Sequence, residues 1–186
     1  MTEEAQAERD RDRPGQEPQP QVGVVAAGLI LRPFNERAEY KTVSRFLERR
    51  IVPLDRILVW GQLPEIYWAS GARPATRFIT SALLTGYDST EPTEPAQPAS
   101  NVRPEQGTPG LWESFYEDFA LHPPRYILDA TRLRLRGSQD FPISRYPDFA
   151  RIVYRDYRFV RAVDGITVYE RKADAPPPVV PREFRT

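Results

Sequence analysis

The sequence predicts an α/β fold: a small three-layer domain in which a mostly parallel sheet carries helices on both faces and ends in a C-terminal antiparallel β-hairpin. Three observations lead to this prediction. Short apolar runs typical of buried strands alternate with helical patterns along the chain. About 150 residues follow a polar leader, which is the usual size of one compact domain. Two alternating runs flank Asp164-Gly165, which is the strongest short signal for a hairpin.

The composition excludes several classes of function. The chain has 26 basic and 26 acidic residues, so no net charge attracts it to nucleic acid or to an anionic membrane, and we expect no nucleic-acid partner. It has no cysteine, which rules out disulfides, thiolate nucleophiles and zinc sites built on sulfur.

Two different segments precede the domain. Residues 1–21 mix charge with Pro and Gln and offer nothing apolar to bury, so they are predicted to be a disordered tail. Residues 22–34 are an apolar stub that opens with VGVVAAGLIL, about half the roughly 20 residues of a membrane-spanning helix. Three interpretations stay open for the stub: a buried strand, a packing helix, or the end of a transmembrane helix whose beginning is missing.

The α/β domain is predicted to span residues 35–172. It opens with a helix over residues 35–50, where Asn35 can cap the first turn and apolar side chains recur at three- and four-residue spacing (Tyr40, Val43, Phe46 and Leu47). Residues 56–60, RILVW, are a nearly continuous apolar run, which is typical of a strand covered on both faces.

A short helix and a long insertion follow this strand. Pro64 suits the first position of the helix PEIYWAS, which Gly71 ends as a left-handed cap. Residues 75–80 are predicted to be a second strand. The Pro-rich stretch 88–109 has almost no apolar side chains, so we expect a flexible surface insertion there rather than a functional lid.

The pattern of helix and strand then repeats. Residues 111–121 follow Thr108-Pro109 as cap and first turn and carry one aromatic stripe (Trp112, Phe115, Tyr116 and Phe119). Such a stripe could stack on a sugar or a base, but a buried helix face is far more common. Residues 125–130 form the next strand, and the helix before it acts as a crossover that makes the strands parallel.

A helix, the hairpin and a tail complete the chain. Pro147 opens a helix with one apolar face (Phe149, Ile152 and Val153). The hairpin strands are predicted at residues 159–163 and 166–171. Residues 173–186 are rich in Pro and are predicted to be a second disordered tail.

The sequence contains no recognisable catalytic motif. Phosphate-binding glycine loops, HExxH and GxSxG are all missing. The single histidine, His122, lies at a helix end, where attraction to the helix dipole explains it. A lone catalytic base would need an orienting carboxylate and a nucleophile, and the sequence identifies neither. We therefore expect no catalytic residue, no metal site and no cofactor.

Five residues are candidates for ligand binding: Gly61, Gln62, Glu65, Arg73 and Asp129. Open α/β sheets bind ligands at the carboxyl ends of their strands, and Asp129 lies near such an end. Gly61 and Gln62 follow the first strand, at the entrance of a helix whose amide groups could receive an anion. Asp129 has a second interpretation, as a strand-end carboxylate that bonds to backbone amides or to Arg132.

Several segments resemble one protein family. They are DRILVWG at 55–61, PEIY at 64–67, GARPATRF at 71–78, PPRYILD at 123–129 and VYER at 168–171. Together with Trp112 and Tyr146-Pro147, they resemble the soluble C-terminal region of bacterial multi-spanning membrane glycosyltransferases of the dolichyl-phosphate-mannose–protein mannosyltransferase type. In that family a membrane bundle transfers a sugar from a polyprenyl-phosphate donor, using acidic residues in an early extracytoplasmic loop.

The chain lacks the bundle and the catalytic loop of this family, so no family catalytic residue is carried over. The resemblance implies an accessory C-terminal domain, detached or truncated, on the extracytoplasmic face of a membrane. Its partner would be a membrane-embedded glycosyltransferase portion or a lipid-linked sugar, and the apolar stub would end the last membrane helix. The alternative is an independent soluble, cytoplasmic module that binds a nucleotide sugar or another anionic ligand.

Overall fold

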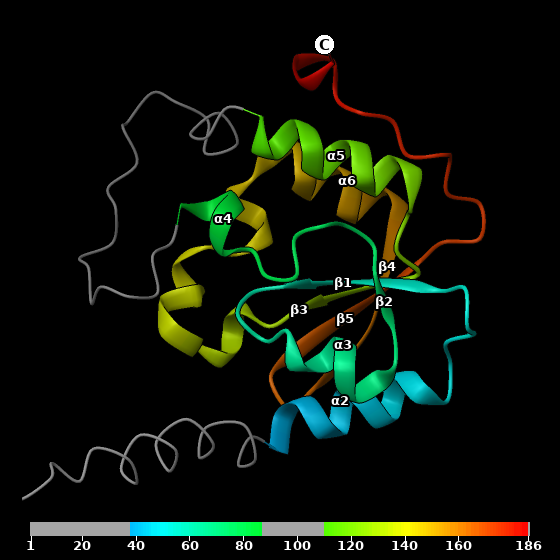
Figure 1. Ribbon diagram of the computed structural model, residues 1–186, viewed down its shortest axis with the longest axis vertical. Coiled ribbons are helices and arrows are strands. Elements are labelled where there is room, and N and C mark those ends of the chain that lie inside the picture. The colour runs from blue at the N-terminus through cyan, green and yellow to red at the C-terminus, as the bar shows by residue number, and fades with distance from the viewer. Residues whose placement is uncertain (1–37, 87–109, 186) are drawn as a thin grey trace, which may run out of the picture. The chain divides into compact units, whose positions relative to one another are not determined.

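The computed structural model describes residues 38–86 and 110–185. The expectations for the leader, the apolar stub, Asn35, Thr108-Pro109 and the whole insertion at 88–109 lie outside these residues. The described part of the chain is a mixed α/β domain built on one five-stranded sheet (Figure 1). Within it, every helix is too short or too polar to cross a membrane.

The sheet is mixed. Its strands are β1 (Arg56–Trp60), β2 (Arg73–Pro74), β3 (Tyr126–Asp129), β4 (Tyr157–Val163) and β5 (Ile166–Arg171), in the spatial order β2-β1-β3-β5-β4. β1 pairs in parallel with β2 and β3, whereas β5 pairs antiparallel with both β3 and β4. The prediction of a mostly parallel sheet is therefore wrong. The reason is that β5, which is more buried than β4, inserts between β3 and β4.

Helices cover both faces of the sheet. α5 (Leu111–Leu121) and α6 (Pro147–Asp156) lie on one face, and α2 (Ala38–Glu48) and α3 (Glu65–Ser70) lie on the other (Figure 1). Side chains of β1 alternate between the two cores, with Leu58 and Trp60 in the first and Ile57 and Val59 in the second. The prediction of a strand covered on both faces is confirmed.

The first core is largely aromatic. All four residues of the predicted stripe on α5 are buried in it, which confirms the core interpretation of that stripe. The ring of Trp60 lies 4.9 Å from the ring of Phe149 and 5.3 Å from that of Tyr146, measured between centroids. The predicted start of α6 at Pro147 and the left-handed cap at Gly71 (φ 66°) are also confirmed.

The segment after α3 differs from the prediction. β2 contains only Arg73 and Pro74, and residues 75–80 are not a strand. The chain instead turns over the end of β1, where the backbone N–H of Ser81 donates to the carbonyl oxygen of Gly61 at 3.2 Å. A short helix, α4 (Ala82–Thr85), follows. Three 3-10 helices between β3 and α6 were also not predicted: η2 (Thr131–Leu133), η3 (Leu135–Asp140) and η4 (Ile143–Arg145).

Residues 173–185, predicted to be part of a disordered tail, make contacts with the domain. Arg171 donates hydrogen bonds from its side chain to the carbonyl oxygens of Ala175 and Pro176. A 3-10 helix, η5 (Arg182–Phe184), then places Phe184 against Tyr116 of α5, with ring centroids 4.9 Å apart. Val180 of the same segment also packs against the first core, and the prolines reduce the conformational entropy that docking costs.

Candidate ligand-binding cleft

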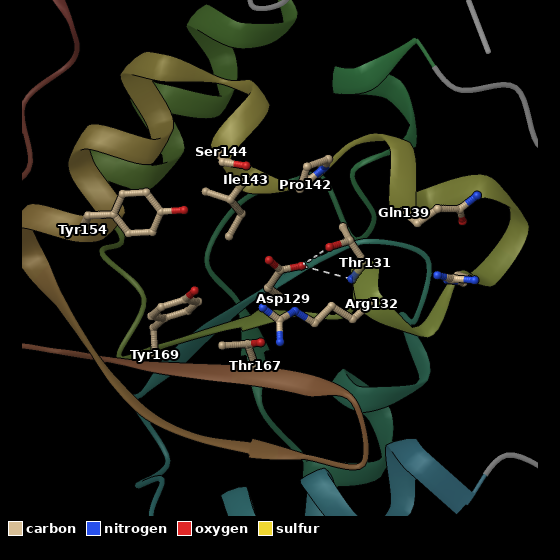
Figure 2. Close-up of a pocket in the computed structure, with 11 residues that line it drawn as sticks. Asp129, Thr131, Arg132, Gln139, Pro142, Ile143, Ser144, Tyr154, Thr167 and Tyr169 are labelled. Atoms are coloured by element: carbon tan, nitrogen blue, oxygen red, sulfur yellow. Dashed lines mark hydrogen bonds between the residues drawn. The ribbon is translucent and has the colours of Figure 1, made fainter.

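A polar cleft of about 480 Å³ opens at the carboxyl end of β3. It lies between β5, α6 and the 3-10 segments η2 to η4 (Figure 2). The side chains that give it chemical character are Asp129, Thr131, Arg132, Arg134, Gln139, Ser144, Tyr154, Thr167 and Tyr169. This is the edge at which α/β sheets commonly bind ligands.

Asp129 is the carboxylate of the cleft. Its Oδ1 atom accepts hydrogen bonds from the hydroxyl group of Thr131 at 2.6 Å and from the backbone N–H of Thr131 at 3.0 Å. Within the described residues no hydrogen bond reaches Oδ2, and the carboxyl group faces the cleft (Figure 2). Burial raises the pKa of Asp129, and the two bonds from Thr131 only partly offset this effect. The group therefore keeps one open acceptor oxygen in a poorly solvated position.

β5 supplies the facing wall. Its pairing with β3 aligns Asp129 with Thr167, and Tyr169 lies two residues further on, so both side chains point to the same face of the sheet. Tyr154 extends from α6 on the other side of the cleft (Figure 2). Burial raises the pKa of Tyr169, and the negative charge of Asp129 raises it further. The charge of Asp129 therefore acts directly on the hydroxyl group of Tyr169.

Two arginines bring positive charge to the cleft. Arg132 and Arg134 follow β3 directly, and both are exposed. The positive charge of Arg132 lowers the pKa of both Asp129 and Tyr169, which places its guanidinium group near them. Within the described residues neither arginine side chain forms an ion pair or a hydrogen bond, so both can bind an anionic ligand.

Only one of the five predicted site residues lines this cleft, namely Asp129. Its alternative interpretation is correct in part, because it bonds to the backbone amide of Thr131. Gly61 lies at the same sheet edge, but its N–H donates to the hydroxyl oxygen of Ser81 at 3.2 Å and its carbonyl oxygen accepts from the Ser81 N–H. The backbone of Gly61 is therefore engaged within the fold.

The other candidates lie elsewhere. Gln62 and Glu65 are not among the residues that line the cleft, and α3 has only six residues, too short to offer an anion a strong helix terminus. Arg73 pairs with Arg56 at the amino end of β1, opposite the Asp129 edge. His122 also lies there and ends α5, where its backbone N–H donates to the Asp118 carbonyl oxygen at 2.8 Å.

Sequence reasoning missed the tyrosines, the threonines and Arg134, and it named Arg132 only as a partner of Asp129. One signal was present for β5, because Thr167 and Tyr169 alternate with apolar Ile166 and Val168 in a strand that proves central. Tyr154 and the η2–η4 residues carry no such signal. Their position depends on how the chain folds back over β3.

Within residues 38–86 and 110–185, no group of three or more His, Asp or Glu side chains is placed to hold a metal ion. Comparison of the chain with protein-family models, with curated proteins and with solved structures finds no match.

Proposed function

We propose that this domain is a non-catalytic binding module that holds a phosphorylated sugar in the Asp129 cleft. In this proposal it is the accessory domain of a polyprenyl-phosphate-sugar-dependent membrane glycosyltransferase, acting on the extracytoplasmic face and positioning the lipid-linked sugar for a membrane-embedded catalytic portion. One observation carries the binding function: a carboxylate, two tyrosines and two exposed guanidinium groups converge on one cleft. The link to glycosyltransferases rests on the resemblance of the segments at 55–61, 71–78 and 123–129.

Each group has a role in this proposal. The Oδ2 atom of Asp129 accepts hydrogen bonds from sugar hydroxyl groups, since carboxylates form strong charge-assisted bonds. The rings of Tyr154 and Tyr169 offer apolar faces to the sugar while their hydroxyl groups stay available for hydrogen bonds. Arg132 and Arg134 bind the phosphate, to which the planar guanidinium group is well matched.

The proposal takes the domain as a three-layer scaffold whose sheet is closed by a β4–β5 hairpin. In that arrangement β5 has two tasks. It completes the core, and it presents Thr167 and Tyr169 to the ligand from a central strand whose partners on both sides restrict its movement.

A second candidate is an independent module that binds a nucleotide sugar in the same cleft. The exposed ring of Tyr154 favours this alternative, because aromatic side chains commonly stack on nucleobases. The two candidates differ in the part of the ligand that contributes affinity. A nucleotide sugar would gain affinity from its base, whereas a lipid-linked sugar would gain it from the phosphosugar and the first prenyl unit.

To test the proposal, the full chain is titrated and binding is monitored by nuclear magnetic resonance. The ligands are mannose, mannose 1-phosphate, a short-chain prenyl phosphomannose, GDP-mannose and inorganic phosphate. We expect saturable binding of the phosphorylated sugars and weaker binding of mannose and of phosphate. Asp129→Ala and Arg132→Ala should each lower the affinity about tenfold, which corresponds to loss of about one charge-assisted hydrogen bond.

The chain offers matched controls. Glu65→Ala and Arg161→Ala remove the same charges outside the cleft and should leave the affinity unchanged. A folded protein that binds none of the phosphorylated sugars, or equal losses in the control variants, would contradict the proposal. Binding that requires the guanine base would favour the independent module.

A further inference from the structure

A second cleft, of about 390 Å³, lies at the opposite edge of the sheet. It is formed where β1 and β2 begin and where α5 connects to β3 (Figure 1). Its basic side chains are Arg56, Arg73 and Arg125, and its apolar side chains include Leu54 and Leu121. No part of the proposed sugar site uses these residues.

The cleft is locally basic although the chain as a whole carries no net charge. Three arginines and one carboxylate, that of Asp55, line the cleft. A second carboxylate, that of Glu170, lies 4.0 Å from Arg125, so the arginines exceed the neighbouring carboxylates by one. The carboxylate of Asp55 pairs with Arg125 at 3.0 Å, and Arg56 donates to the carbonyl oxygen of Pro74 at 2.8 Å. Salt confines electrostatic fields to about 8 Å, so a charged ligand would sense this local excess rather than the net charge of the protein.

Arg73 is the most available of the three cations. It is exposed, and within the described residues its side chain forms no ion pair or hydrogen bond. The aliphatic part and the guanidinium group of Arg73 are therefore free to contact a ligand that approaches from solvent.

Two large apolar side chains lie beside these charges. Leu54 is 82% exposed and Leu121 is 74% exposed, and both line the same cleft as the arginines. Isolated exposed leucines are common on protein surfaces. Here two of them, from segments far apart in the sequence, border one basic cleft, and this combination fits a ligand that is both anionic and apolar.

We propose that this edge makes a peripheral contact with the surface of an anionic phospholipid bilayer. Lipid phosphate groups bind at Arg73 and Arg125, and Leu54 and Leu121 enter the interface between headgroups and acyl chains. A free phosphate would use the arginines but leave both leucines in water, whereas a bilayer uses both. The inference does not rest on the sugar-binding function, because it concerns the other edge of the sheet.

The absence of cysteine from the sequence allows a single-site test in the full chain. An environment-sensitive fluorophore, NBD, is attached through Leu54→Cys, and the matched control carries it through Leu83→Cys. Leu83 is 66% exposed on α4, which follows the Ser81 that bonds to Gly61 at the carboxyl edge. Vesicles of phosphatidylcholine, with or without phosphatidylglycerol, are then added.

We expect the label at position 54, and not at position 83, to shift to shorter emission wavelength and to be quenched by nitroxide-labelled lipids. The response should require phosphatidylglycerol. Arg73→Glu in the labelled chain should weaken vesicle binding about tenfold, since it reverses one charge at the surface. Arg161→Glu reverses an exposed charge on β4, outside both clefts, and should leave binding unchanged.

The labels at positions 54 and 83 are compared in the same full chain. Because residues 1–37 are present in both labelled proteins, any membrane binding by them does not account for a difference between the two labels. If the chain binds vesicles while the label at position 54 stays in water, or responds as the label at 83 does, the proposal is overturned. If inorganic phosphate perturbs Arg73 while vesicles leave the label unchanged, the cleft binds a soluble anion and the proposal is likewise overturned.

Discussion

The indole Nε1 of Trp60 donates a 2.9 Å hydrogen bond to the carbonyl oxygen of Phe141, which lies 81 positions further along the chain. Both residues are buried. The bond joins the end of β1 to the connection between η3 and η4, and the next residues of that connection include Ile143 and Ser144 of the Asp129 cleft. One wall of the cleft is thus attached directly to the central sheet.

Replacing Trp60 with Phe should lower the free energy of unfolding by about 2 kcal/mol, because it leaves a buried carbonyl unpaired and creates a small cavity. Chemical denaturation measures this change. Trp112→Phe is a matched control, since Trp112 donates a similar buried bond to the carbonyl oxygen of Leu84. Both variants should be destabilised, but only Trp60→Phe should perturb the resonances of Ser144. An unchanged Ser144 would show that the bond does not position the cleft wall.

Replacing Gly61 with Ala should destabilise the domain by about 2 kcal/mol. The φ angle of Gly61 is +121°, and an added Cβ would lie 3.3 Å from the Cβ of Ala130. Gly71→Ala separates backbone strain from crowding, because Gly71 has a φ of +66° with no atom within 4 Å of an added Cβ. We expect about 1 kcal/mol for that variant. Equal losses in denaturation experiments would argue against close packing at Gly61.

Replacing Asp118 with Asn should lower the Tm by a few degrees at neutral pH. Its carboxylate accepts from the Nε of Arg77 at 2.8 Å, from the Nη2 at 2.9 Å and from the Arg77 backbone N–H at 2.8 Å. The interaction joins α5 to the irregular segment after β2. Exposure of Arg77 limits the effect, because water screens the pair.

The pH dependence of this effect has a defined sign. Hydrogen bonds from Arg77 hold the pKa of Asp118 below its usual value. The stabilisation is therefore fully present above the unfolded pKa, about 3.9, and is lost as pH falls through the lower folded value. The difference in Tm between wild type and Asp118→Asn should stay constant from neutral pH down to about pH 5 and then shrink. Glu117→Gln, on the same helix, should show no such trend, and a gap that persists in acid would rule out the ionic contribution.

Replacing Phe184 with Ala should detach the C-terminal segment. Phe184 is 8% exposed and packs against Tyr116, so its loss should cost about 2 kcal/mol in docking of the segment. Limited proteolysis and hydrogen exchange of residues 173–185 measure the change. Val179→Ala, at a position that is 58% exposed, is the control and should leave protection intact. If the segment stays protected without Phe184, the anchor lies elsewhere.

Local patterns in the sequence predicted the helices and strands in which the pattern of apolar residues matches the pattern of buried side chains. The aromatic stripe of α5 follows the helical period and marks the buried face of that helix. The continuous apolar run of β1 marks a strand that is covered on both faces. The helix start at Pro147 and the cap at Gly71 follow from backbone preferences of single residues. Asp129 was identified because it ends a buried strand.

Only the tertiary structure decided the strand order and the composition of the cleft. β5 lies between β3 and β4 because its side chains are buried better there, and no local pattern specifies which of the two antiparallel strands becomes the inner one. That choice brings Thr167 and Tyr169 to Asp129, while folding of η2 to η4 over β3 adds Arg132 and Ser144. The spacing of apolar residues within a segment indicates which side chains of that segment are buried. A binding site built from several segments depends on long-range pairing, which periodicity does not contain.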